Sequence, residues 1–273
     1  MTYLFFGTPE FAAIILEKLI SAGFLPRAVV CNPDKPVGRK KIITPPPVKQ
    51  LIAERKEQIV ILQPEKLDSS LKFQVSSLNP DFFVVAAYSK ILPKEILNIP
   101  KLGSIGVHPS LLPKYRGPTP IQTAILNGET ETGVTLYLMD EKVDHGPILA
   151  KRELEFPISN FQFPILLKKL AELGGDLLIE TLPKFLRGEI KPLAQNETQA
   201  TYTKKFTAED GFVDLEKDEP ALIERKIRAF NPEPGVWTIK NGKRMKILEA
   251  QIIDKRLVLK KIQVEGKKPV VTN

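Results

Sequence analysis

The first thirty residues alternate between apolar runs and one amphipathic stretch. The apolar run over residues 3–6 predicts a buried first strand. After it, Thr8 suits a helix N-cap, Pro9 suits the first helical position, and Gly23 suits the residue that ends the helix near Ala22. A second apolar run over residues 27–31 follows, and this order predicts a parallel βαβ unit.

The same alternation continues as far as residue 186. Further strands are expected at residues 59–62, 82–87, 104–108, 134–139 and 148–154, and helices at residues 67–78, 121–126 and 160–186. The run over residues 82–87 is wholly apolar, as expected for a strand whose sheet is covered on both faces. These patterns predict an α/β fold with a doubly wound, mostly parallel sheet.

The pattern changes after Gly188. Residues 189–206 are polar, which is typical of a linker, and a short helix is expected at residues 221–230. From Val236 onward short β segments are separated by turn residues such as Asn241-Gly242, a favoured hairpin sequence. We therefore predict a doubly wound α/β domain over residues 1–188, a linker over 189–206, and a small β domain, for which a barrel is one possible form, over 207–273.

Composition limits the cellular compartments in which the protein is expected to work. The 273 residues are 42% hydrophobic and 26% charged, a globular balance, and no apolar run approaches the ~18 residues of a membrane span. The N-terminus lacks the basic region and cleavage site of a signal peptide, so we interpret it as the first strand. Cys31 is the only cysteine, which excludes an intrachain disulfide and a cysteine-based zinc site. We expect a cytoplasmic protein without a membrane association.

Positive charge is concentrated in two segments. The net charge is +8, and residues 240–273 contain ten Lys or Arg against three Asp or Glu. Residues 35–49 carry five cations and no acid, and their prolines and Gly38 are expected to exclude a regular element there. A solvated surface is one interpretation and contact with phosphates is the other. Trp237 is either a core residue or a stacking platform.

The first turn of the α/β pattern does not favour a nucleotide cofactor. Gly7 is followed by Thr8-Pro9-Glu10, without the second and third glycines that allow a backbone to approach a pyrophosphate. Glu10 also places a negative charge where the phosphate would bind. We interpret Gly7 as structural.

Candidate chemistry is concentrated between residues 104 and 148. Both histidines of the chain, His108 and His145, are in this segment, and His108 ends a predicted strand at the edge where open α/β sheets bind ligands. Asp144 is in a turn closed by Gly146. Either side chain alone has a structural explanation, but together a His and an Asp can move a proton or stabilise an anion. Ligand spacing for zinc and a nucleophile elbow around Ser110 are both missing.

At these positions the chain resembles the 10-formyltetrahydrofolate-dependent formyltransferases. Residues 107–117, Val-His-Pro-Ser-Leu-Leu-Pro-Lys-Tyr-Arg-Gly, are similar to their signature, and Asp144-His145-Gly146 is similar to their Asp-x-Gly turn. Further similarity lies at residues 6–11, 33–39, 45–49, 86–93 and 228–232. The resemblance implies a Rossmann-like catalytic domain followed by an OB-like barrel. The segments at 33–49 and 228–232 point to the members that act on initiator tRNA charged with methionine.

The resemblance also implies a site. His108 and Asp144 would carry the catalysis, 10-formyltetrahydrofolate would be the co-substrate, and no metal would be needed. The folate would contact the segment 134–144 and the following residues: Tyr88, Lys90, Ile91, Leu92, Ser110, Leu111, Leu112 and Pro113. The cations expected to contact the tRNA are Lys35, Arg39, Lys40 and Lys41. We expect the protein to act as a monomer.

Three departures from the family pattern affect these expectations. Gly106 stands where the family has the Asn of Asn-x-His, Tyr88-Ser89 stands where Tyr-Gly is usual, and the chain ends at Asn273, where relatives commonly continue for some tens of residues. If the only consequence of Gly106 is the loss of an asparagine amide that would contact the formyl oxygen, we expect a slow enzyme. We then expect Gly106→Asn to raise kcat. The alternatives are a formyltransferase for a small amine, such as a nucleotide-linked amino sugar, and a catalytically silent RNA-binding protein.

Overall fold

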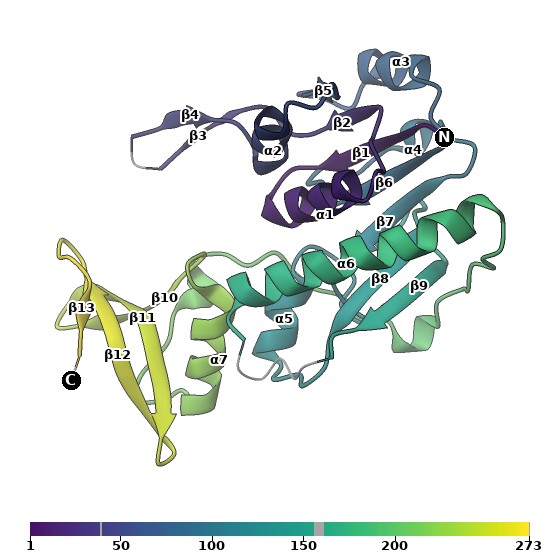
Figure 1. Cartoon of the computed structure of the whole chain (residues 1–273). Helices are drawn as coiled ribbons and strands as arrows, with labels where there is room; N and C mark the ends of the chain where they lie inside the picture. Colours follow the sequence, from purple (N-terminus) through teal and green to yellow (C-terminus); the bar gives the residue numbers. More distant parts are fainter. Residues whose placement is uncertain (39, 156–160, 273) are drawn as a thin grey trace. The chain divides into compact units, whose positions relative to one another are not determined.

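A computed structural model describes residues 1–38, 40–155 and 161–272 (Figure 1). The chain forms two compact units. We call Met1–Arg116, Gly133–Leu154 and Lys168–Thr201 the N-terminal unit. The remaining segments, Gly117–Thr132, Glu155–Leu167 and Tyr202–Asn273, form the C-terminal unit.

The N-terminal unit is built on a seven-stranded sheet of order β5-β2-β1-β6-β7-β8-β9. Its strands are β1 (Tyr3–Gly7), β2 (Ala28–Val30), β5 (Val60–Leu62), β6 (Phe82–Ala86), β7 (Ser104–His108), β8 (Gly133–Leu138) and β9 (Ile148–Glu153). The first five strands in this order are parallel, and β7, β8 and β9 pair antiparallel. The expected doubly wound, mostly parallel sheet is therefore confirmed.

Helices cover the sheet, and the wholly apolar strands are buried on both faces for this reason. The helices are α1 (Glu10–Ser21), α2 (Pro47–Arg55), α3 (Ser69–Ser77), α4 (Lys94–Leu97) and α6 (Phe163–Leu186). Gly174 brings α6 close to the sheet, because a Cβ there would lie 3.1 Å from Val107 Cγ1. At the end of α1, Gly23 has φ +83°, the left-handed conformation expected of the residue after a helix.

Two local predictions are wrong. Thr8 does not cap α1: Pro9 is the N-cap, and Thr8 Oγ1 accepts a hydrogen bond from the Asn32 backbone, which joins the ends of β1 and β2. Residues 35–49 do contain regular structure, because β3 (Lys35–Val37) and β4 (Ile42–Thr44) pair as a hairpin and α2 follows. Pro36 is tolerated there because a two-stranded ribbon has open edges.

In its described residues, the C-terminal unit contains a four-stranded antiparallel sheet, the α-helices α5 and α7, and a short 3-10 helix. Its elements are α5 (Pro120–Leu126), η3 (Glu209–Gly211), α7 (Pro220–Phe230), β10 (Val236–Lys240), β11 (Lys243–Ile253), β12 (Arg256–Val264) and β13 (Val270–Val271). Asn241 and Gly242 both have positive φ and join β10 to β11, as their sequence predicts. The amphipathic helix α7 buries Ile223, Ile227 and Phe230.

Residues 189–206, predicted as a linker, contain the short η2 (Glu197–Gln199) and pair Leu193 with Ile148. The domain boundaries remain a prediction. Within the described ranges, no helix combines the length and apolar character needed to cross a lipid bilayer.

Candidate active site

The parallel strands β1, β2, β6 and β7 end at one edge of the sheet, and His108 and the segments that follow β6 and β7 are at this edge. Asp144 comes from the segment between β8 and β9 and is brought to His108. His108 is the last residue of β7, and the segment from Ala87 onward leaves the neighbouring strand β6. Ala87, Tyr115 and Asp144 all have left-handed backbone conformations, with φ of 47°, 61° and 49°. Such conformations are costly for residues other than glycine and are concentrated at functional sites.

The ring of His108 is buried between two hydrogen-bond acceptors. Nε2 lies 2.8 Å from the carbonyl oxygen of Tyr115, and Nδ1 lies 3.5 Å from Asp144 Oδ2. A carbonyl and a carboxylate both only accept, so each ring nitrogen faces an acceptor. The predicted partnership of His108 with Asp144 is therefore present in the geometry.

Asp144 is held from three sides. Its Oδ1 accepts a hydrogen bond of 2.6 Å from the Tyr137 hydroxyl, while Oδ2 faces His108. Its backbone carbonyl accepts from Gln195 Nε2 at 2.9 Å, and the same amide donates to the Gly146 carbonyl at 2.8 Å. Gly146 itself permits the turn, because a Cβ there would collide with the carbonyl oxygen of Leu138.

The buried Arg116 holds Gln195, the residue whose side-chain amide fixes the Asp144 turn. The Arg116 side chain is fully buried and donates to Gln195 Oε1 at 2.8 Å and to the two carboxylate oxygens of Glu197 at 3.0 and 2.7 Å. These bonds from Arg116, more than the nearby charge of His145, lower the pKa of the Glu197 carboxyl. Arg116 is part of the sequence signature, but the contacts from residues 195–197 come from a segment that we predicted to be a linker.

The space beside Gly106 is occupied. Gly106 of β7 is directly opposite Tyr137 of β8, and a Cβ at Gly106 would lie 2.5 Å from Cζ and 2.8 Å from the hydroxyl oxygen of that tyrosine. The expectation that an asparagine would simply fill a gap here is therefore wrong, because an aromatic ring fills it. Sequence reasoning missed Tyr137, although a glycine within a buried strand signals that another group approaches closely.

The predicted folate residues occupy two segments. Ser110, Leu111, Leu112 and Pro113 follow β7, and the buried Thr135 fixes them, since its hydroxyl donates to the Ser110 carbonyl and accepts from the Leu112 backbone. The Ser110 hydroxyl donates to the Lys114 carbonyl. Lys151 donates to the Leu112 carbonyl, and burial lowers the pKa of this lysine.

The second segment follows β6. Leu92 is buried in the core, Ile91 is exposed, and Lys90 Nζ donates to the carbonyls of Pro64 and Glu65. Burial raises the pKa of Tyr88 to about 12, so its hydroxyl keeps its proton. Within the described residues, the buried Tyr88 hydroxyl and Asn32 Oδ1 have no hydrogen-bond partner. Unpaired buried polar atoms are costly, and a polar ligand at this edge would relieve that cost.

Three of the four predicted RNA-contacting residues lie on the β3–β4 hairpin. Lys35, Lys40 and Lys41 are exposed, and Arg39 lies outside the described residues. Lys49, also counted among the cations of this segment, has a different role, because it forms a 2.9 Å ion pair with Asp34. Exposed apolar side chains of Val37, Ile42 and Ile43 accompany the lysines on the hairpin.

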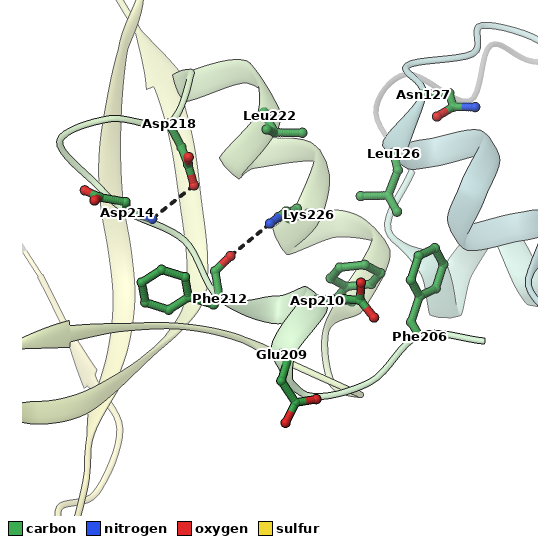
Figure 2. A pocket seen from close by; sticks show the side chains of 11 residues that line it. Leu126, Asn127, Phe206, Glu209, Asp210, Phe212, Asp214, Asp218, Leu222 and Lys226 are labelled. Carbon is green, nitrogen blue, oxygen red and sulfur yellow. Dashed lines mark hydrogen bonds between the residues drawn. The ribbon is translucent and has the colours of Figure 1, made fainter. Parts of the chain in front are cut away.

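The C-terminal unit contains a pocket of about 560 Å³ (Figure 2). Its walls include Leu222 and Phe230, and its four acids are Glu209, Asp210, Asp214 and Asp218. The lining residues bond to their own chain: Lys226 donates to the Phe212 carbonyl, and the Asp214 backbone donates to Asp218 (Figure 2). The acids make this pocket unsuitable for a polyanion.

The sheet of the same unit provides the opposite charge. Lys240, Lys243 and Lys246 are exposed on β10 and β11, while Arg244 stacks on Trp237 with its guanidinium carbon 4.1 Å from the ring centroid. Trp237 Nε1 also donates to the Ala208 carbonyl, and its ring packs edge-on against Phe212. The half-buried Trp237 is therefore a packing residue of this sheet rather than an open platform.

Comparison with known proteins identifies the family. Residues 1–182 match the family described as formyl transferase, and residues 205–257 match the formyl transferase C-terminal domain. The chain belongs to the formyl transferase family.

Within this family the chain is similar to methionyl-tRNA formyltransferases. It is 45% identical to that of Chloroflexus aurantiacus over 254 residues, 92% of this chain and 80% of the relative. It is 46% identical to that of Enterococcus faecalis over 246 residues, 89% of this chain and 77% of the relative. The fold also matches the crystal structure of HypX from Aquifex aeolicus in complex with tetrahydrofolic acid, with a TM-score of 0.69 and 19% identity over 99% of this chain and 45% of that one.

Proposed function

We propose that this protein transfers the formyl group of 10-formyltetrahydrofolate to the amino group of methionine carried by initiator tRNA, giving N-formylmethionyl-tRNA. The observation that carries the proposal is the His108–Asp144 pair at the carboxyl end of β7, in a chain 45% identical to enzymes of that name. The reaction joins an amine to a formyl carbon and releases the folate nitrogen. It needs a donor for the developing oxyanion and a route for one proton.

His108 supplies the donor. Its Nε2, which contacts the Tyr115 carbonyl in this structure, exchanges that contact for the developing oxyanion. A donor aimed at a developing oxyanion is usually a large part of catalysis in acyl transfer. Asp144 keeps the ring in its orientation through Oδ2. Asp144 is also the group that accepts the proton from the attacking amine, directly or through a water, and passes it toward the leaving nitrogen.

The folate binds along the edge formed by the ends of β6 and β7. Tyr88 and Asn32 are the residues whose unpaired buried polar atoms suit the polar pterin, and Ser110 to Pro113 form the neighbouring wall. Leu92 is buried and supports this wall from the core, whereas Ile91 is exposed and available to the ligand.

The tRNA contacts two cationic surfaces. On the β3–β4 hairpin Lys35, Lys40 and Lys41 bind phosphates, while Val37 and Ile42 provide apolar contact near the acceptor end. On the C-terminal sheet the exposed lysines bind phosphates elsewhere along the tRNA backbone. Because its substrate is an aminoacylated tRNA, we infer that the protein works in the cytoplasm, and we expect a monomer to suffice.

The test is a formylation assay with 10-formyltetrahydrofolate and three acceptors in parallel: methionine-charged initiator tRNA, free methionine and a nucleotide-linked amino sugar. We expect product only with the charged tRNA. Transfer to the amino sugar alone would replace the proposed substrate. Binding of the tRNA without transfer to any acceptor would make the protein a silent RNA-binding relative.

A further inference from the structure

We propose that Tyr137 is a positioning residue for Asp144, and that the absence of a side chain at Gly106 makes room for the Tyr137 ring. The inference rests on the proposed function and deepens it. In this active site, an aromatic ring from β8 and a glycine from β7 together take the place in which the family pattern has an asparagine.

The hydroxyl of Tyr137 and the ring of His108 hold opposite oxygens of one carboxylate. Tyr137 donates to Asp144 Oδ1 at 2.6 Å, and His108 Nδ1 lies 3.5 Å from Oδ2. A carboxylate fixed at both oxygens cannot rotate without losing one contact. The short Tyr137 bond therefore sets the direction in which Oδ2 points, and it acts on the reaction through Asp144 and His108.

The ring is fixed by packing. Tyr137 is buried in a cluster with Leu112 and Ile148, and Met139 packs against this cluster. On the other side the ring lies over Gly106, its cross-strand neighbour. A Cβ at Gly106 would lie 2.5 Å from Tyr137 Cζ, so any larger residue must displace the ring from its packed position.

Tyr137 stays a hydrogen-bond donor at any pH at which the protein works. Burial first, and the neighbouring Asp144 second, raise the pKa of the Tyr137 hydroxyl well above its ordinary value. The phenol thus keeps its proton and cannot be the base of the reaction. Its contribution is the fixed bond to Asp144.

The first test is Tyr137→Phe, which keeps the ring and removes only the hydroxyl. In single-turnover assays on methionine-charged initiator tRNA, we expect kcat to fall about 10–100-fold, the range for losing a group that orients a functional side chain. KM for the folate and for the tRNA should stay unchanged, because the hydroxyl is committed to Asp144. Tyr3→Phe is the matched control, since Tyr3 is also buried and its hydroxyl donates to the Phe24 carbonyl, away from the site.

The second test asks whether Gly106 and the Tyr137 ring together occupy the space of the asparagine in the family pattern. Gly106→Asn alone should lower Tm, because the new side chain displaces a packed ring. Gly106→Asn combined with Tyr137→Leu should recover both Tm and kcat relative to Gly106→Asn alone, since the smaller side chain leaves space for the amide. The two positions should therefore be strongly non-additive in a double-mutant cycle.

The outcomes separate the two proposals. If the wild-type protein formylates charged initiator tRNA and Tyr137→Phe does so with unchanged kcat, Tyr137 does not position Asp144. Additive effects of Gly106→Asn and Tyr137→Leu would contradict the inference that Gly106 makes room for the Tyr137 ring. A wild-type protein inactive on the charged tRNA would instead overturn the proposed function itself.

Discussion

The edge of the N-terminal sheet and the surface of the C-terminal sheet use polar residues in opposite ways. At the edge, a few buried groups are held by specific contacts: His108 between Tyr115 and Asp144, and Asp144 between His108 and Tyr137. On the C-terminal sheet, lysines such as Lys240 and Lys243 are exposed and face each other across a hairpin. The first arrangement depends on position, the second on charge.

This difference has a physical reason. Stabilising a developing charge requires a donor within hydrogen-bond distance in a site shielded from water, where an error of one ångström is costly. Holding a long polyanion requires only that several cations neutralise phosphates, and each contributes a similar amount. Loss of one group should therefore damage the edge site severely and the cationic sheet gradually.

The largest effect is expected from the edge site. His108→Ala and Asp144→Ala should each lower kcat on the order of 10²–10⁴-fold, the range for losing an oxyanion donor or a proton-transfer partner. Because the two side chains act as one unit, the double variant should be little worse than either single variant. Single-turnover formylation measures all three. Multiplicative losses, or a single variant with wild-type kcat, would mean that the pair does not act as one unit.

The next effect concerns the C-terminal sheet. Lys240→Ser, Lys243→Ser and Lys246→Ser together should raise KM for the tRNA and leave kcat unchanged. The slope of log Kd against log salt should decrease by roughly one for each lysine that contacts a phosphate. Filter binding between low and moderate salt measures this slope. Lys72→Ser on α3, an exposed cation of the N-terminal unit, is the control, and an equal loss there would make the effect one of net charge alone.

A smaller effect is expected from the hairpin. Lys40→Ser with Lys41→Ser should raise KM for the initiator tRNA several-fold and reduce discrimination against elongator tRNA charged with methionine. Folate binding should not change. The two tRNAs compared under the same conditions provide the measurement. An unchanged kcat/KM for both would remove the hairpin from the proposed RNA surface.

The smallest effect concerns the support of the Asp144 turn. Hydrogen bonds from Arg116 lower the pKa of Glu197, so this carboxyl favours the folded state above its ordinary pKa of 4.5 and loses that contribution as pH falls through the lowered value. Tm of the wild-type protein should therefore fall more steeply between pH 5 and the acid limit than Tm of Glu197→Gln. Thermal unfolding of both proteins over that range measures how Tm depends on pH, and parallel curves of Tm against pH would contradict this prediction.

Much of the fold was accessible from local pattern. The strand expected at residues 104–108 is β7, and the helix expected at residues 221–230 is α7, which begins one residue earlier. Strongly periodic apolar runs allow this because one burial pattern suits one type of element. The β3–β4 hairpin was missed because proline and glycine usually end regular elements, and a two-stranded ribbon tolerates them.

The sequence by itself determined the chemical groups of the candidate site. It placed His108 at the end of a strand, Asp144 in a turn closed by Gly146, and cations in two segments, because these features follow from neighbouring residues. Only the tertiary structure decided what surrounds them. Tyr137 reaches Gly106 through the pairing of β7 with β8, and Gln195 reaches the Asp144 turn from 51 residues away along the chain. Such contacts depend on strand register and chain return, which no local pattern encodes.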